Sequence, residues 1–307
     1  MSEDVIYLSS KNFIKRVKEI RGIVKENKAD IIWSWGGVEA TFGVFLSLTS
    51  SVNHINGSIR HGIVRFKLHQ IWRLLVLHLS KNIVANSFAG LKANGIYRGA
   101  VLYNGIDDSF FCEPQTQSAL IRGVFEIEED VVLLASVANL VPYKDYDTVL
   151  KALSIIKSKG IPFHYIAIGE GPERRHIEGL VQIHNLSQNV TFPGNRSDIK
   201  DILYASDIFI HSSRGEGCSN AILEAMAVGL PIIASDTGGT REIVDNNVGR
   251  LFEFQNAKQL ASLIMNQICN NLERELLAEN SKHKAASNFS IERMMSNYYK
   301  IIEGVIK

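Results

Sequence analysis

The chain has 307 residues, 46% of them hydrophobic and 21% charged, a composition that fits a globular protein of two domains of about 150 residues each. Its 33 basic and 32 acidic residues leave a formal net charge of +1, so we expect no nucleic-acid partner. The three cysteines, Cys112, Cys218 and Cys269, are far apart and odd in number, which fits neither a disulfide framework nor a zinc site.

The start of the chain, MSEDVIYLSSKNF, is acidic and lacks the apolar core of a signal peptide. Every apolar run along the chain is shorter than the ~18 residues that a membrane-spanning helix needs. Cysteines without an evident partner suit a reducing compartment. We therefore expect a cytoplasmic protein, with peripheral contact at the inner face of the cytoplasmic membrane as a second option.

Short apolar runs alternate with segments of helical period along the whole chain, which is typical of βα units packed on parallel sheets. The expected fold class is therefore α/β. In the first part of the chain, helices are expected at Phe13–Glu26 and Val64–Leu79. Strands are expected at Val5–Leu8, Ile31–Trp35, Val52–Ile55, Ile83–Asn86 and Val101–Tyr103.

A polar stretch with little periodicity, residues 104–130, follows and is interpreted as an interdomain linker. We expect an N-terminal unit of residues 1–112, a C-terminal unit of residues 113–290, and a final helix, 291–307, that packs back toward the N-terminal unit. In the second unit, strands are expected at Val131–Ala138, Phe163–Ile168, Val190–Phe192, Ile208–His211 and Pro231–Ala234. The final helix is expected at Ile291–Ile306.

A glycine-rich turn follows the buried-type strand DIFIHSS, within the sequence RGEGCSNAILEAMAVGLP. Ser219 is a good N-cap, Asn220–Val228 is a strong helical run, and Gly229 is a helix stop signal. Gly217 therefore lies on a strand-to-helix turn. Free N–H groups at the helix start, with the helix dipole behind them, form an anion site suited to a diphosphate.

Two glutamates flank this turn, and a second turn follows the next strand. Glu224 lies one turn inside the helix, where a carboxylate suits the two hydroxyls of a ribose, and Glu216 precedes the helix. The second turn, SDTGGTREIV, carries Gly238, Gly239 and Glu242. Such turns are common for structural reasons alone, but two at neighbouring sheet edges favour a ligand cleft beyond the carboxyl ends of the strands.

The segment EGCSNAILEAMAVGLPIIASDTGGTREIV resembles the donor-site signature of family 4 of the retaining glycosyltransferases, which have the two-domain GT-B fold. Further resemblance is found in LVPYKD, IGEGPERRHIE, VTFPGNRSDI, IVANSFAGL and VLYNGID, so that it covers about residues 30–300. It implies a metal-independent, retaining enzyme that moves a hexose-type sugar from a nucleotide diphosphate to a glycan or lipid-linked acceptor. Bacterial lipopolysaccharide or capsule assembly is the context it suggests.

The resemblance also implies roles for individual residues. Glu224 would bind the ribose hydroxyls, Glu216 the donor sugar and Lys144 the diphosphate. Asn139 stands where the family usually has an arginine, which removes one charge and weakens the expected hold on the donor. The donor-binding set is completed by Gly217, Cys218, Ser219, Asn220, Gly238, Gly239 and Glu242.

The acceptor side is less well marked. Members of the resembled family carry a histidine just after a strand in the middle of the N-terminal domain, and SVNHINGSIRHG is the corresponding stretch. His54 and His61 are therefore catalytic candidates, and Arg60 is an acceptor-side candidate for contact with an anion. Alternatively, His54 is a satisfied strand histidine and His61 a helix-cap residue; Asn56 also lies in this stretch.

The segment from His61 to Lys81 mixes basic residues with Ile, Leu and Trp72. Such a basic amphipathic helix suits contact with anionic lipid headgroups. An ordinary half-buried helix with a solvated side has the same pattern.

The resembled family normally has further βα units and a glycine-rich turn before a segment such as ADIIWSWGG, which this chain reaches by residue 30. We therefore expect a reduced N-terminal unit. Two alternatives stay open: a nucleotide-sugar-binding protein with little transfer activity, and a GT-B enzyme of another type, such as a sugar-nucleotide epimerase. The EAMA and GG-x-x-E patterns argue against the epimerase.

Overall fold

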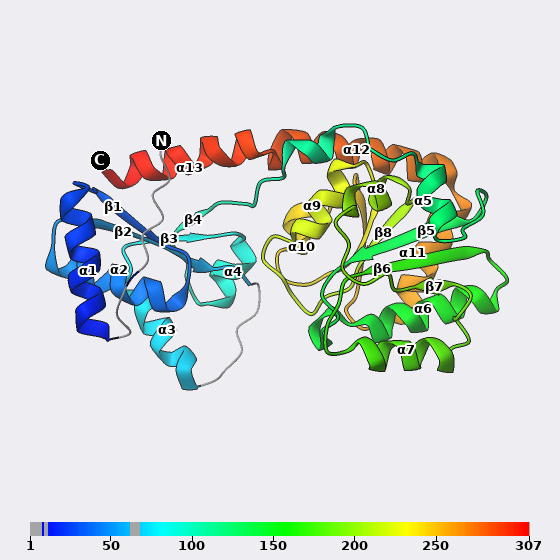
Figure 1. Cartoon of the computed structure of the whole chain (residues 1–307), viewed down its shortest axis with the longest axis horizontal. Helices are drawn as coiled ribbons and strands as arrows, with labels where there is room; N and C mark the ends of the chain where they lie inside the picture. The colour runs from blue at the N-terminus through cyan, green and yellow to red at the C-terminus, as the bar shows by residue number, and fades with distance from the viewer. Residues whose placement is uncertain (1–7, 9–11, 62–67, 307) are drawn as a thin grey trace.

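The computed structural model describes residues 8, 12–61 and 68–306, and Figure 1 shows two α/β units side by side. The first unit is built on a parallel sheet with the strand order β1-β2-β3-β4. Its strands are β1 (Ile31–Ser34), β2 (Asn53–Ile59), β3 (Asn82–Ala85) and β4 (Ala100–Val101). Its helices are α1 (Phe13–Glu26), α2 (Gly37–Thr49), α3 (Leu68–Leu79) and α4 (Phe88–Ala93).

The second unit is a six-stranded parallel sheet with the order β10-β9-β8-β5-β6-β7. Its strands are β5 (Val132–Val137), β6 (Phe163–Ile168), β7 (Val190–Thr191), β8 (Ile208–His211), β9 (Ile232–Ser235) and β10 (Gly249–Phe252). Its helices are α5 (Ser118–Val124), α6 (Tyr146–Ser158), α7 (Arg174–Ile183), α8 (Ile199–Tyr204), α9 (Asn220–Ala227), α10 (Thr240–Ile243), α11 (Ala257–Cys269) and α12 (Asn271–Phe289). Chain order reverses between β5 and β8, and open sheets of this kind bind ligands at such a reversal.

The core of the second unit explains its parallel sheet. Strands β8 and β9 are buried at every position, as expected when helices cover both faces. Tyr165, Phe209 and Phe252 are the largest fully buried side chains of the described chain. This core holds the carboxyl ends of β5 and β8 next to each other.

The last helix, α13 (Ile291–Ile306), belongs to the second unit in sequence but packs on the first sheet. In Figure 1 it runs back from α12 over the N-terminal sheet. Its apolar side covers Ile55, Val84 and Leu102 with Met294, Tyr298, Ile301 and Val305. Where α12 gives way to α13, Ile106 donates a backbone hydrogen bond of 2.8 Å to Phe289 and forms a parallel bridge with Ser290.

The α/β class is confirmed, and α1 and α13 begin and end at the predicted residues. The expected strand Val5–Leu8 lies outside the described residues except for Leu8. The structure describes the part Leu68–Leu79 of the expected helix Val64–Leu79, and this part is α3. Residues 104–130, interpreted from the sequence as an interdomain linker, contain a helix in their second part. There, α5 places Ile121 in a core cluster with Ile127 and Leu133.

Candidate functional site

The glycine-rich turn between β8 and α9 leaves backbone donors free. Ser219 is the N-cap of α9 as predicted, but its side chain makes no capping hydrogen bond. Within the described chain, the N–H groups of residues 217–220 donate to no partner. Unpaired amides at a helix start attract anions.

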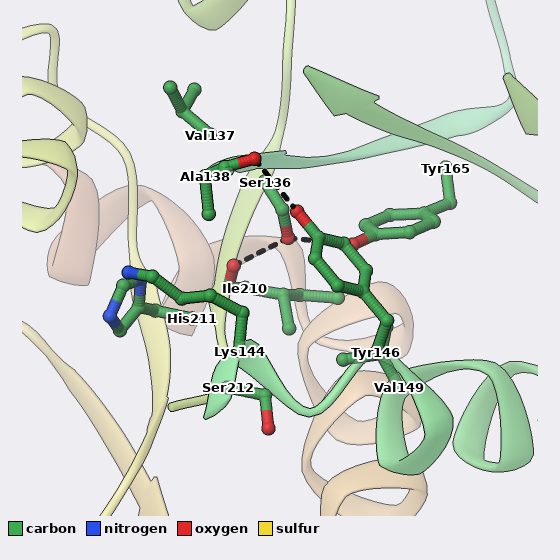
Figure 2. Close-up of a pocket in the computed structure, with 10 residues that line it drawn as sticks. All are labelled: Ser136, Val137, Ala138, Lys144, Tyr146, Val149, Tyr165, Ile210, His211 and Ser212. Atoms are coloured by element: carbon green, nitrogen blue, oxygen red, sulfur yellow. Dashed lines mark hydrogen bonds between the residues drawn. The ribbon is translucent and has the colours of Figure 1, made fainter. Parts of the chain in front are cut away.

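Lys144 reaches this turn from the opposite side of the strand reversal. Lys144 is the last residue of a short 3-10 helix, Pro142–Lys144, that follows β5. The Tyr143 carbonyl accepts a 2.8 Å hydrogen bond from the Arg214 amide, which connects this helix to the glycine-rich turn after β8. The Lys144 ammonium forms an ion pair with the Glu216 carboxylate. Both side chains are largely buried, at 10% and 19% exposed. Figure 2 shows Lys144 and His211 extending side by side.

His211 is the third member of this cluster. It is 3% exposed at the end of β8, and its Nε2 atom lies 3.6 Å from Glu216 Oε1. Burial lowers the pKa of the imidazole, although Glu216 acts in the opposite direction. Burial alone would raise the pKa of the Glu216 carboxyl, but His211 and Lys144 outweigh it and hold that pKa well below its usual range. Glu216 is therefore an ionised carboxylate at neutral pH.

Beneath these side chains lies a cavity of about 10 Å³, enough for roughly one water molecule. Its polar wall connects three strands: the Tyr165 hydroxyl donates to Ser136 Oγ at 2.8 Å, and Ser136 Oγ donates to the Ile210 carbonyl at 2.6 Å. Figure 2 shows this network behind Lys144 and His211. It fixes the strand ends that carry the cluster.

Glu224 lies one turn inside α9, and its carboxylate makes no hydrogen bond or ion pair with the described residues. Burial raises the pKa of its carboxyl from the ordinary 4.5 to about 7. A half-buried carboxylate without a partner destabilises the free protein, which is typical of a group that meets its partner in a ligand.

This shift predicts a stability effect with a definite sign. Between pH 4.5 and about 7 the folded state holds a proton on Glu224 that the unfolded chain releases, so stability falls as pH rises through this window. Glu224→Gln removes the ionisation. We expect it to raise the free energy of unfolding by about 1–3 kcal/mol at pH 8 and to change little at pH 4.5, measured by urea denaturation. Glu279→Gln, on the exposed side of α12, is the control; an equal gain at both pH values for Glu224→Gln would contradict the expectation.

Asn139 lies near this cluster but does not join it. It follows β5, its side chain is exposed, and its carbonyl accepts a 3.0 Å hydrogen bond from the Val141 amide. The side chain makes no described hydrogen bond.

The second glycine-rich turn packs directly on the first. The Gly239 amide donates to the Glu216 carbonyl at 2.8 Å. A Cβ atom on Gly239 would overlap the Gly217 carbonyl, and one on Gly238 would overlap the Glu216 backbone. Gly217 in turn faces the first unit, because a Cβ there would overlap the side chain of Asn86, directly after β3. The glycines thus allow two turns and the neighbouring unit to meet.

Glu242, which the resemblance places in the donor-binding set, contacts the first unit through its carboxylate. It accepts hydrogen bonds of 2.8 Å and 2.7 Å from the amides of Phe88 and Ala89 at the start of α4, and one of 2.9 Å from the Tyr103 hydroxyl. Favourable charge at a helix start explains the contact. Glu242 links the two units and has both carboxylate oxygens occupied.

The histidine stretch also differs from expectation. His54 lies inside β2, not after it; it is 3% exposed and packs against Gly43 of α2. Its Nε2 atom is 2.8 Å from Ser34 Oγ, and burial lowers its pKa to about 4. His54 is thus a neutral histidine in the interior of the first unit. Asn56 is buried in β2, where it donates to Ser80 Oγ at 2.9 Å.

Arg60 and His61 do follow β2, and both are exposed. Asn86 connects them to the glycine-rich turn. Its Nδ2 atom donates to the Arg60 carbonyl at 3.4 Å, and its side chain lies against Gly217 of that turn. Asn86 was not predicted as a site residue, although its place at the end of an expected strand was a signal.

Asn104, just after β4, was missed as well. Its Nδ2 atom donates to the Cys218 carbonyl at 3.0 Å and to Asn220 Oδ1 at 2.6 Å. Cys218 itself is buried and unoxidised. The start of α9 is therefore held from the segment that joins the two units.

Residues 117–284 match the model of a known family, the Glycosyl transferases group 1. The chain belongs to this family. Among its relatives, the O-antigen biosynthesis glycosyltransferase WclY of Escherichia coli is 30% identical over 164 residues, which make up 53% of this chain and 44% of WclY. The match thus spans less than half the length of that relative.

Solved structures confirm the GT-B fold of this group 1 glycosyltransferase. HepE of Anabaena in complex with UDP superposes with a TM-score of 0.85 at 21% identity, covering 94% of this chain and 82% of HepE. A glycosyltransferase from Rickettsia africae superposes with a TM-score of 0.83 at 21% identity, covering 98% of this chain and 84% of the other.

Proposed function

We propose that this group 1 glycosyltransferase transfers a hexose-type sugar, with retention of configuration, from a nucleotide diphosphate to a glycan or lipid-linked acceptor. The observation that carries the proposal is the grouping of Lys144, Glu216 and the free amides of residues 217–220 at the strand reversal of the second sheet. A role in cell-surface polysaccharide assembly is supported by the similarity to WclY. A uridine nucleotide is supported by the likeness to HepE, which binds UDP.

In this reaction the bond from the sugar to the diphosphate breaks while an acceptor hydroxyl oxygen bonds to the same carbon from the same face. Negative charge grows on the leaving phosphate, which takes up the proton of that hydroxyl. Lys144 and the free amides of α9 are the positive groups placed to stabilise that charge. They make a metal ion unnecessary in the proposed mechanism. Asn139, at the end of β5, contributes a polar side chain without charge.

The two glutamates take separate tasks in the proposal. Glu224 binds the ribose hydroxyls, which would supply the hydrogen bonds that its carboxylate lacks in the free protein. Glu216 faces the sugar; its carboxylate is paired with Lys144 and lies 3.6 Å from His211 Nε2. Residues 113–290 are thus the donor side, residues 1–112 the acceptor side, and 291–307 the helix that joins them again.

A donor panel tests the proposal. UDP-, GDP- and ADP-sugars are titrated by calorimetry, and nucleotide release is followed with wild type, Glu216→Ala, Glu224→Ala and the control Glu279→Ala. We expect one class of donor to bind, Glu224→Ala to weaken that binding roughly tenfold or more, and the control to behave as wild type. Binding of no donor would refute the proposal. Binding without release or transfer would identify a nucleotide-sugar-binding protein instead.

Peripheral membrane contact is the proposed location of the acceptor side. No helix of the described chain is long and apolar enough to cross a membrane. However, α3 exposes large apolar side chains, with 59% of Ile71, 59% of Trp72, 52% of Leu75 and 61% of Leu79 accessible. The expected basic residues Arg65, Lys67 and His69 lie outside the described residues or side chains.

We expect the protein to co-sediment with vesicles that contain anionic phosphatidylglycerol. Ile71→Glu with Leu75→Glu should reduce the bound fraction several-fold, because it introduces charge into the apolar face of the interfacial helix. Leu276→Glu, at an equally exposed position of α12 (58%), is the matched control. Equal sedimentation of all three proteins, or none with wild type, would remove the membrane from the proposal.

A further inference from the structure

A stack of aromatic rings leads from the last helix to the acceptor-side edge of the first sheet. Tyr298 of α13 stacks on Trp33 of β1, with ring centroids 4.6 Å apart and planes inclined by 13°. Trp33 stacks on Trp35, with centroids 5.1 Å apart and an angle of 17°. The guanidinium carbon of Arg60 lies 4.9 Å from the centroid of Trp35. Four flat groups thus follow one another.

Gly57 makes room for this stack. It lies in β2, beside the first strand, and a Cβ atom there would come within 2.6 Å of Trp33 Nε1 and 3.0 Å of Trp35 Cε3. Any side chain would push the two indoles away from the sheet. The stack is therefore built into the strand pairing.

Arg60 ends the stack without an anionic partner. Its side chain is exposed and forms no ion pair or hydrogen bond with the described residues. By contrast, Arg122, Arg174 and Arg250 are each paired with a carboxylate. A guanidinium that lies flat over an indole keeps its N–H edge free for an acceptor in its own plane. Arg60 thus lies against the Trp35 ring and has no carboxylate partner among the described residues.

The position of Arg60 connects it to the proposed reaction. Arg60 and Trp35 follow neighbouring parallel strands, so they lie at the carboxyl ends of the sheet. Asn86 donates to the Arg60 carbonyl at 3.4 Å and also lies against Gly217 of the glycine-rich turn. One residue therefore separates Arg60 from the turn that carries the free amides.

We propose that Trp35 and Arg60 form an acceptor subsite for an anionic group, a phosphate or a carboxylate, on the glycan or lipid-linked acceptor. The inference rests on the proposed function. Arg60 gives the anion paired, charge-assisted hydrogen bonds, and Trp35 fixes the direction of the guanidinium. The acceptor would thereby be held beside the sugar donor.

Fluorescence titration tests the subsite. Trp72→Phe leaves Trp33 and Trp35 as the reporters, since the chain has 3 tryptophans. Methyl phosphate, glucuronate and glucose are titrated as phosphate, carboxylate and neutral probes. We expect at least one anion to change the tryptophan emission and glucose to have no effect; the tighter anion identifies the group. Arg60→Ala should raise the Kd of that anion roughly tenfold or more, and Arg60→Lys less, because lysine lacks the planar pair of donors.

Lys92→Ala, which removes an exposed charge from α4, is the matched control and should bind the anion as wild type does. Equal anion affinity in wild type and Arg60→Ala, or no emission change with either anion, would overturn the subsite. UDP binding by calorimetry should be the same in wild type and Arg60→Ala. If wild type bound none of the donors in the panel, the proposed function would be refuted, whereas the anion titration would still report on the subsite by itself.

Discussion

Replacing Lys144 by Ala is expected to lower kcat/KM for sugar transfer by about 10²–10³-fold, the usual effect of removing one preorganised group that stabilises transition-state charge. The Lys144 side chain is 10% exposed, and its ammonium is already paired with Glu216. Its loss removes the cation proposed for the leaving diphosphate. It also leaves the Glu216 carboxylate buried without its ammonium partner.

The second effect gives an independent readout. Lys144 helps to hold the pKa of Glu216 low against the opposite effect of burial, so Lys144→Ala should raise that pKa. The residual activity of the variant should therefore fall at a higher pH than that of wild type when the solution is acidified.

Lys151→Ala is the matched control, because Lys151 lies on α6 a few residues further along the chain and is exposed. Steady-state kinetics over a pH series compares the three proteins. If Lys144→Ala kept wild-type activity, or if the control lost as much, Lys144 would not be the group that stabilises the leaving phosphate.

Replacing Gly239 by Ala is expected to lower the free energy of unfolding by about 2–3 kcal/mol, the cost of overfilling a packed site. The new Cβ would overlap the Gly217 carbonyl and lie 2.9 Å from Ser87 Cβ. Backbone atoms cannot turn away as a flexible side chain can. The added methyl group must therefore push the two glycine-rich turns apart or separate the second unit from the first.

Gly179→Ala is the opposite case and serves as the control. Gly179 lies inside α7, and a Cβ there would meet nothing within 4 Å. Alanine should stabilise the helix by about 0.5–1 kcal/mol. Urea denaturation measures both variants, and calorimetry with UDP tests whether only Gly239→Ala also weakens nucleotide binding. A Gly239→Ala protein as stable as wild type would show that the turns are not packed as described.

The second unit was largely predictable because its strands are short, buried apolar runs between glycine-rich turns. The periodicity also located α13, whose apolar positions recur at helical spacing. β10 was missed because half of its residues, Arg250 and Leu251, are only partly buried and its run is short. α5 was not predicted because a helix of 7 residues has too few turns to show a helical period of apolar residues.

Strand β2 shows why the acceptor side was harder to predict. Asn56, Gly57 and Ser58 have the composition of a turn, so the expected strand ended at Ile55, whereas β2 continues to Ile59. The glycine is there because two indoles occupy the space above it. That contact depends on the neighbouring strand, so the residues of β2 alone did not indicate it.

Contacts between distant residues had no sequence signal of their own. Lys144 and Glu216 were both identified by motif, but their ion pair joins turns 72 residues apart. Glu242 lies in a matched motif, and only the position of α4 shows that its carboxylate bonds to the first unit. Motifs located these side chains and did not indicate their partners.

Within the residues that the structure describes, the chain crosses between the two units twice, and the crossings are tied together where Ile106 pairs with Phe289 and Ser290. Two adjacent connections of this kind act mechanically as one pivot: they permit rotation about a common axis and resist sliding or twisting of one unit against the other. Rotation away from the pivot would separate Glu242 from α4 at the same time as it separated Arg60 from the glycine-rich turn. Opening for product release and loss of the acceptor position would then be one movement.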